Sequence, residues 1–311
     1  MKLKSNPLMP GDLIGVIAPA SPVHQGEELA KAINNLESLG FRTLLGAAAM
    51  ISQGGFLAGS DQARLEELMD LWTDPQVKGI WALRGGYGTL RLLGQLDYQM
   101  IARVPKPLIG FSDITALELA LWSKLSLVSF HGPVLTKLTS EFSRNQGYQM
   151  LSGKFMPGME LPWNSKENLA RLVVFKPGRA GGVLLGGNLV TLVSLIGTEY
   201  LPELQGAILF LEEVEEAGYR IDRLLSQLLL SGVIDRVSAI LIGQCVPVAG
   251  ETEKHLQKIF WERLSGLGCP VAYGFPIGHL LEQWTLPQGV LVEVDLERGA
   301  ICLLESPWDL M

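Results

Sequence analysis

A chain of 311 residues is longer than one hydrophobic core usually serves, so two domains are expected. Hydrophobic residues make up 48% of it and charged residues 18%, which fits a well-packed globular enzyme and excludes a disordered chain. The formal net charge of −7 at pH 7, with no run of Lys and Arg, makes nucleic acid and anionic membranes poor candidate partners.

The first 137 residues alternate short apolar runs with longer amphipathic segments. Strands are predicted at 12–20, 77–86, 107–112 and 127–133. Helices are predicted at 26–40, 61–74, 89–96 and 114–125. Continuous apolar strands with helices between them are typical of a parallel sheet that is covered on both faces. Residues 1–137 are therefore predicted to form a doubly wound α/β domain.

The pattern changes after residue 137. Residues 138–174 are polar, rich in turn residues and weakly periodic, which predicts a linker or an irregular segment. Over residues 175–311, short apolar runs typical of strands are interrupted by two helical patterns, at 220–232 and 253–268. This half is predicted to form a mixed α+β domain.

Cysteine usage and the N-terminus predict a soluble, cytoplasmic protein. Cys245, Cys269 and Cys302 are odd in number and far apart, so we expect buried free thiols rather than disulfides or a zinc site. The lysines near the N-terminus are not followed by an apolar stretch, unlike those of a signal peptide. The longest apolar stretch, 181–197, is too short and too often interrupted to span a membrane.

Ligands of open parallel sheets bind outside the carboxyl ends of the strands, where this sequence places Ser112. Ser112 follows a predicted strand and precedes a predicted helix, with Gly110 two positions before it, as in a nucleophile elbow. Ile114 stands where the usual elbow motif has its second glycine. The alternative is that Ser112 or Asp113 simply caps the helix at 114–125, and spacing alone favours the cap.

A nucleophilic serine needs a base, and the base needs an orienting acid. Two of the four histidines are candidate bases: His131 at the end of a strand and His279 in a Gly/Pro-rich turn. His24 lies in a loop, and His255 lies on a helix face expected to be solvated. Composition does not separate His131 from His279.

Four glutamates follow the apolar run at 207–211, and they are Glu212, Glu213, Glu215 and Glu216. Acidic residues are common in the first turn of a helix, and a helix is predicted to begin at 220. However, Glu212 and Glu213 end a buried strand, where one of the two side chains must face inward. An inward carboxylate needs a partner.

Two glycine-rich segments follow predicted strands. The backbone N–H groups of 83–90 suit either a phosphate or half of an oxyanion hole, which the N–H of Asp113 would complete. The segment 186–188, which ends in Asn188, is either a turn or a loop that contacts substrate. No motif has the spacing of metal ligands, so no metal and no other cofactor is expected.

Taken together, these motifs resemble the LD-carboxypeptidase family of serine peptidases, which includes the microcin C immunity proteins. The resemblance spans nearly the whole chain in seven segments that occur in the same order, which is far more specific than any one of them. The segments are GDLIGVIAPASP, IWALRGGYGTLRLL, KPLIGFSDITAL, FHGPV, LLGGNLVTLVSLIGT, LFLEEVEEAGYRIDRLLSQL and GFPIGH.

The resemblance implies a catalytic triad of Ser112, Glu212 and His279. Each residue matches its position in a family motif: the serine of G-[FY]-S-D, the first acid after the strand, and the histidine of G-x-P-x-G-H. Glu216 is the other acid that the motif matches, and it is the runner-up for the orienting acid.

The resemblance also implies an oxyanion hole formed by the backbone N–H groups of Gly86 and Asp113. It implies an active site in the cleft between the two domains and, usually, a homodimer. The family releases the terminal D-alanine of murein tetrapeptides during cytoplasmic recycling, so a small peptide is the expected partner. Arg84 is the candidate for binding the terminal carboxylate, and Asn188 is a further candidate substrate contact.

Two other functions stay open. Microcin C immunity proteins hydrolyse aminoacyl-nucleotide conjugates and need aromatic contacts for the adenine, for which Trp163 and Trp284 are candidates. Alternatively, the protein is a non-catalytic small-ligand or nucleotide-binding module, in which the glycine-rich turns contact the ligand and Ser112 is a helix cap.

Overall fold

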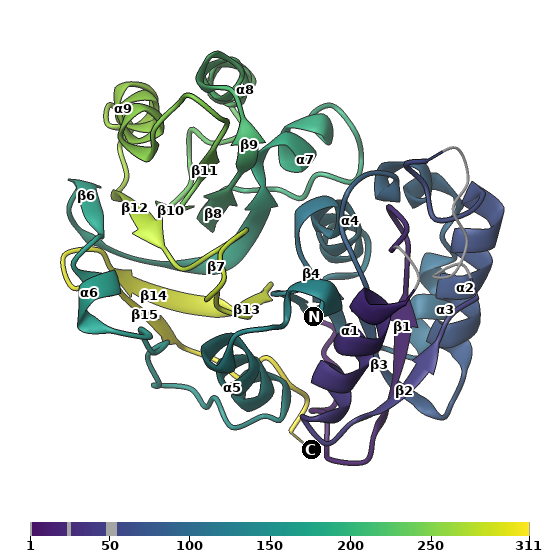
Figure 1. Ribbon diagram of the computed structural model, residues 1–311. Helices are drawn as coiled ribbons and strands as arrows, with labels where there is room; N and C mark the ends of the chain where they lie inside the picture. The colour runs from purple at the N-terminus through teal and green to yellow at the C-terminus, as the bar shows by residue number, and fades with distance from the viewer. Residues whose placement is uncertain (1, 24–25, 48–54, 311) are drawn as a thin grey trace.

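Two β-sheets lie side by side, one built mainly from the N-terminal half of the chain and one from the C-terminal half (Figure 1). The computed structural model describes residues 2–23, 26–47 and 55–310, and every element below lies within these ranges. In Figure 1 the strands of the N-terminal half are purple to blue, and those of the C-terminal half run from teal through green to yellow.

The described part of the N-terminal half contributes five parallel strands in the order β2-β1-β3-β4-β5. These are β1 (Leu13–Ile17), β2 (Arg42–Leu45), β3 (Val77–Ala82), β4 (Leu108–Gly110) and β5 (Ser129–His131). The α-helices of this half are α1 (Glu27–Glu37), α2 (Asp61–Thr73), α3 (Tyr98–Arg103) and α4 (Thr115–Leu125). The predicted parallel α/β sheet is confirmed, and its carboxyl ends meet at one edge.

Two details of this half differ from the prediction. Residues 89–96 form two short 3₁₀ turns, η2 (Thr89–Arg91) and η3 (Leu93–Gln95), instead of a helix. The edge strand β2 was not foreseen, because its side chains are half-exposed or exposed and form no apolar run. Two further 3₁₀ turns are η4 (Ser112–Ile114) and η5 (Leu135–Lys137).

The C-terminal half combines helices and strands, as predicted, and its sheet contains both parallel and antiparallel pairs. Its parallel centre consists of β7 (Arg179–Asn188), β8 (Ile208–Glu212), β10 (Ala239–Gly243) and β12 (Val271–Phe275). Antiparallel strands extend both sides, namely β6 (Val173–Lys176), β14 (Leu291–Asp295) and β15 (Ala300–Leu303). The α-helices are α7 (Leu189–Ser194), α8 (Gly218–Leu230) and α9 (Glu253–Leu264). A small parallel pair, β9 (Val214–Glu216) and β11 (Val246–Pro247), follows the carboxyl ends of β8 and β10.

One strand of the C-terminal half joins the N-terminal sheet. β13 (Leu286–Gln288) pairs antiparallel with β5, with Leu286 opposite His131. The chain then continues into β14 of the other sheet. The division into domains at residues 137 and 175 stays a prediction. That prediction did not include a strand of the C-terminal half that pairs with the N-terminal sheet.

The segment 138–174 is not wholly irregular, so that part of the prediction is wrong. It contains α5 (Glu141–Leu151), whose first turn is capped by the Ser140 side chain, and the single turn α6 (Lys166–Leu169). The buried face of α5 is partly polar, and Gln146 bonds both the N–H and the C=O of Thr285. A helix that packs through polar groups lacks the apolar period on which the prediction relied.

Two expectations about the whole chain can be compared with the described residues. The three cysteines are free thiols, with Cys245 and Cys269 buried and Cys302 partly exposed. Within the described ranges, no helix combines the length and the apolar character needed to cross a membrane.

Candidate active site

Ser112 occupies a strained elbow between β4 and α4. Its φ is 65°, in the left-handed region that residues with a Cβ rarely adopt. A Cβ on Gly85 would lie 2.9 Å from Ser112 Cβ, and a Cβ on Gly110 would lie 2.8 Å from the Ile114 side chain. Gly85 therefore allows the loop after β3 to approach Ser112, and Gly110 allows the Ile114 side chain to pack against β4.

Neither Ser112 nor Asp113 caps α4 with its side chain, so the capping interpretation is wrong. The residue before the helix is Ile114, and no side chain bonds the first turn there. Asp113 instead turns toward η2: its carboxylate accepts a hydrogen bond of 2.8 Å from the Thr89 N–H, and its carbonyl accepts one of 2.5 Å from the Thr89 hydroxyl. Burial raises the pKa of Asp113, and the bonds from Thr89 offset part of that rise.

The two predicted oxyanion amides lie beside Ser112. Gly86, Asp113 and Ser112 line one cavity of about 300 Å³. Within the described part of the chain, the N–H groups of Gly86 and Asp113 have no hydrogen-bond acceptor. Gly86 has a φ of 113°, and a Cβ there would lie 2.2 Å from the Ser21 hydroxyl oxygen. Glycine is thus required where the amide approaches the cavity.

Glu212 and His279 form a hydrogen-bonded pair. Glu212 ends β8 and is fully buried, and its Oε2 lies 2.7 Å from His279 Nδ1. Gly278 lets the two approach, because a Cβ there would lie 2.4 Å from that same oxygen. Burial raises the pKa of Glu212, but His279 and, to a lesser extent, His131 lower it more, so the pKa lies below its usual value. Glu212 is therefore a carboxylate that accepts from the imidazole.

Glu216, the other acid that the sequence proposes, lies apart from His279. Its carboxylate bonds the N–H of Ala217 and the Arg220 side chain. The structure thus brings Glu212, and not Glu216, to the imidazole.

Phe111 links the serine elbow to His279. The Phe111 and His279 rings lie 4.5 Å apart between centroids, and Phe111 directly precedes Ser112. His279 and Phe111 line a cavity of about 450 Å³, which adjoins the Ser112 cavity at Val214 of β9. Among the described residues, Ser112 Oγ forms no hydrogen bond, including with His279.

His131 and His255 are not hydrogen-bonded to Ser112. His131 is fully buried, and its Nδ1 lies 3.5 Å from the carboxylate of Glu118 on α4. His255 is exposed on α9, as predicted. His24 lies outside the described residues.

Sequence reasoning missed Glu118 as a buried carboxyl group near the site. Its second partner is Gln288 of β13, whose side chain donates a hydrogen bond of 2.7 Å to Glu118. The signal was a glutamate inside the otherwise apolar run of α4.

Asn188 and Glu213 form one wall of the Ser112 cavity. Asn188 caps α7 by accepting from the Thr191 N–H, and its amide donates to Glu213 Oε1 at 3.0 Å. Glu213 Oε2 accepts from the Val190 N–H. Burial, followed by the charge of Glu212, raises the pKa of Glu213 to about 7. Both glutamates at the end of β8 are therefore buried, each with its own partners.

Three sequence candidates for substrate contact lie elsewhere. Arg84 donates from Nη1 to the Pro22 carbonyl at 3.1 Å and lines neither cavity. Trp284 is fully buried, and its indole N–H bonds the Pro162 carbonyl. Trp163 bonds the Gly299 carbonyl and packs edge-on against Trp284. The two tryptophans therefore pack against each other, and neither lines the cavities of Ser112 and His279.

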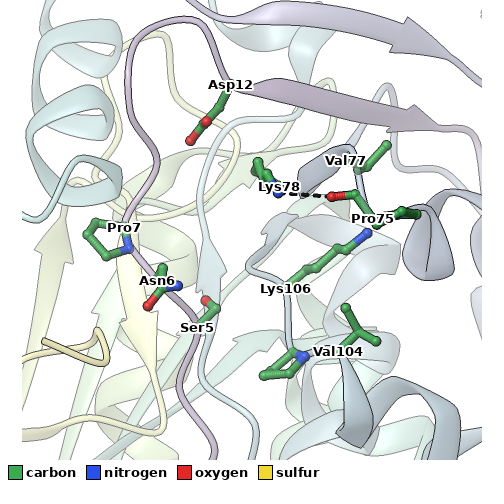
Figure 2. Close-up of a pocket in the computed structure, with 10 residues that line it drawn as sticks. Ser5, Asn6, Pro7, Asp12, Pro75, Val77, Lys78, Val104 and Lys106 are labelled. Atoms are coloured by element: carbon green, nitrogen blue, oxygen red, sulfur yellow. Dashed lines mark hydrogen bonds between the residues drawn. The ribbon is translucent and has the colours of Figure 1, made fainter. Parts of the chain in front are cut away.

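A further cavity, of about 360 Å³, lies at the amino ends of the N-terminal strands (Figure 2). Lys106 lines it, but its amine already bonds the carbonyls of Leu71 and Asp74 at the end of α2. Lys78 bonds the Pro75 carbonyl, as Figure 2 shows. None of the candidate catalytic residues lines this cavity. Within the described ranges, no group of three or more His, Cys, Asp or Glu side chains is placed to hold a metal ion.

Comparison with known proteins gives consistent matches over both halves of the chain. The LD-carboxypeptidase N-terminal domain model matches residues 14–132, and the LD-carboxypeptidase C-terminal domain model matches residues 181–294. The chain is 35% identical to the probable murein peptide carboxypeptidase of Bacillus subtilis, over 97% of this chain and 98% of the relative.

Solved structures show the same fold. The muramoyltetrapeptide carboxypeptidase of Oxalobacter formigenes has a TM-score of 0.79 and 32% identity, covering 93% of this chain and 97% of its own. MccF in complex with glutamyl sulfamoyl guanosine has a TM-score of 0.88 and 27% identity, covering 99% of this chain and 100% of its own. The microcin C7 self-immunity protein MccF of Escherichia coli is 30% identical over 98% of this chain and 96% of its own.

Proposed function

The chain belongs to the LD-carboxypeptidase family, and from this premise we propose that it is a serine peptidase that releases terminal D-alanine from murein tetrapeptides. The names of the relatives support this substrate class. The observation that carries the proposal is the buried Glu212–His279 hydrogen bond beside the strained elbow that presents Ser112.

In the proposed reaction, His279 takes the proton of Ser112 Oγ while that oxygen attacks the scissile carbonyl carbon. Glu212 holds the imidazole in the tautomer with its proton on Nδ1 and stabilises the imidazolium. The N–H groups of Gly86 and Asp113 receive the oxyanion. His279 then protonates the leaving amine of D-alanine as the C–N bond breaks, which leaves an acyl ester on Ser112.

Water completes the cycle. His279 removes a proton from the water as its oxygen adds to the ester, and returns the proton to Ser112 Oγ when the ester bond breaks. The Ser112–His279 hydrogen bond must form for the first step, and in this proposal it forms when the substrate binds.

The proposal extends to the setting of the enzyme. We place the protein in the cytoplasm as a homodimer, with residues 1–137 carrying the nucleophile and residues 175–311 carrying the acid and the base. Such a location suits the recycling of peptides from the cell wall.

D-Alanine release from tetrapeptides that contain either L-lysine or diaminopimelate tests the reaction. The wild-type protein should release D-alanine, and Ser112→Ala and His279→Ala should each lower kcat by about 10³-fold or more. Glu212→Gln should lower kcat strongly and leave KM within a few-fold, because the acid acts through the base. Release that is unaffected by Ser112→Ala, or no release by the wild type, would overturn the proposal.

Hydrolysis of an aminoacyl-nucleotide conjugate is the second candidate, which the structural likeness to MccF favours. The packed positions of Trp163 and Trp284 count against it. An aminoacyl sulfamoyl adenosine assayed beside the tetrapeptides would separate the two. A binding module, in contrast, should show ligand-dependent thermal stabilisation that does not depend on His279 or Glu212.

A further inference from the structure

The leaving group of the proposed reaction must lie on the side of His279. The same imidazole that activates Ser112 later gives its proton to the departing amine. The terminal residue of the peptide, with its free carboxylate, therefore extends toward the cavity of about 450 Å³ that His279 lines.

One cation lines that cavity within the described ranges, and it is Lys137 at the end of η5. Its side chain is exposed, and its amine has neither an ion-pair nor a hydrogen-bond partner among the described residues. Thr136 and Thr139 also line this cavity, and each carries a hydroxyl that can donate a hydrogen bond. A lysine ammonium and threonine hydroxyls are groups suited to a carboxylate.

The backbone that carries Lys137 is well fixed. Its N–H bonds the Val134 carbonyl at 2.8 Å, and the Thr136 N–H bonds the carbonyl of Leu83 at the end of β3. Leu135, the first residue of η5, is fully buried. The flexible part of Lys137 is thus its side chain alone, projecting from a fixed turn at the catalytic edge of the sheet.

We propose that Lys137 binds the terminal carboxylate of the peptide in the cavity that it shares with His279. This inference rests on the proposed carboxypeptidase function and identifies the residue that restricts cleavage to the last peptide bond. It replaces Arg84, which bonds the Pro22 carbonyl and lines neither cavity of the site.

Glu215 also lines this cavity, so the cavity is not uniformly positive. Its carboxylate, like the Lys137 amine, has no ion-pair partner in the described ranges. An amino acid released by the reaction carries one ammonium and one carboxylate. A cavity with one unpaired charge of each sign suits such a zwitterion, with the carboxylate on Lys137.

The test compares two substrates that differ only in this carboxylate: a tetrapeptide that ends in D-alanine and the same peptide as its C-terminal amide. Release of D-alanine or D-alaninamide is measured by liquid chromatography and mass spectrometry. The wild type should prefer the free acid by about 10- to 100-fold in kcat/KM, the range expected of a charged hydrogen bond.

Lys137→Met should lower kcat/KM for the acid by about 10- to 100-fold and leave the amide within about three-fold, so that the preference falls to near one. Lys137→Arg should retain most of the preference, because it keeps the charge. Lys78→Met is the matched control, since it removes an exposed lysine at the opposite edge of the sheet (Figure 2). It should leave both substrates unchanged.

An unchanged preference in Lys137→Met would overturn the assignment, and so would loss of the preference in Arg84→Met with Lys137→Met unaffected. If the wild type releases nothing from either peptide, the proposed function itself fails. Release with an unaltered ratio contradicts only the role of Lys137.

Discussion

Glu212 and Glu213 are two buried carboxyl groups within the candidate site, and their partners give them different properties. Glu212 bonds an imidazole, which keeps its pKa below the usual value in spite of full burial. Glu213 is the next residue, but its partners are the neutral N–H groups of Asn188, Val190 and Val214. Burial and the neighbouring Glu212 charge therefore raise the pKa of Glu213 to about 7. Proximity in sequence does not decide the charge of a side chain; the bonded partner does.

The raised pKa of Glu213 predicts a pH-dependent stability. The native state binds a proton on Glu213 more tightly than the unfolded state does, so this group favours folding at low pH. Its contribution is lost as the pH rises through about 7, by up to about 3 kcal/mol. Glu213→Gln has no such titration. The free energy of unfolding of the wild type minus that of Glu213→Gln should therefore fall between about pH 5 and pH 8.

Urea unfolding of both proteins across this pH range measures the difference. Loss of one hydrogen bond in the variant changes the difference in unfolding free energy by an amount that does not depend on pH. A difference that stays constant, or that rises with pH, contradicts the raised pKa.

At the scale of elements, α4 is tied to both sheets by one buried polar bridge. Glu118 in the middle of α4 accepts from the amide of Gln288 on β13, and Gln288 Oε1 accepts from the N–H of Gly186 on β7. α4 begins just after Ser112, and β7 ends at Asn188, which lines the Ser112 cavity. The bridge therefore fixes the elbow relative to the opposite wall of the cavity.

Exchange of the two partners tests this bridge. Gln288→Glu places two carboxylates against each other in the core and should cost about 3–5 kcal/mol of unfolding free energy. Glu118→Gln added to it restores a single donor and a single acceptor, because residue 288 still accepts from Gly186 and now accepts from residue 118. The double variant should recover most of the loss, as measured by urea unfolding of all four proteins of the cycle. Purely additive effects of the two substitutions would show that the bridge carries no coupling.

At the scale of the whole molecule, the sequence predicts the parallel sheet and its functional edge better than the links between the two halves. Continuous apolar runs reveal β1, β3, β4, β8 and β10, because strands buried on both faces contain few polar residues. α5 was not predicted, because its buried face includes Gln146, which forms hydrogen bonds where an apolar side chain would be expected. β13 was not predicted either, because its three residues include a proline and a glutamine and so form no apolar run.

The residues of the candidate site also differ in how well the sequence predicts them. The elbow of Ser112 is visible as a strand, a glycine and a helix in succession. The pairing of Glu212 with His279 across 67 positions is not visible in any local pattern and followed from the family resemblance alone. Lys137 gave no signal at all, because an exposed lysine gains meaning only from the cavity that it lines.

The crossing of β13 gives the two sheets a shared apolar core, from which we predict that the two halves unfold together. Leu286 of β13 is fully buried and belongs to an apolar cluster that contains Phe130 of β5, Phe210 of β8 and Val292 of β14. Because residues of both sheets share this cluster, loosening it should destabilise both halves equally. Leu286→Ala should lower the unfolding free energy by about 2–4 kcal/mol.

Hydrogen exchange followed by mass spectrometry resolves the two halves separately. In moderate denaturant, peptides that contain β4 and peptides that contain β8 should become less protected by the same free energy in the Leu286→Ala variant. Loss of protection confined to the N-terminal peptides would mean that β13 stabilises only the sheet it joins. Equal loss would mean that the elbow of Ser112 and the pair of Glu212 and His279 are held together by one folding transition.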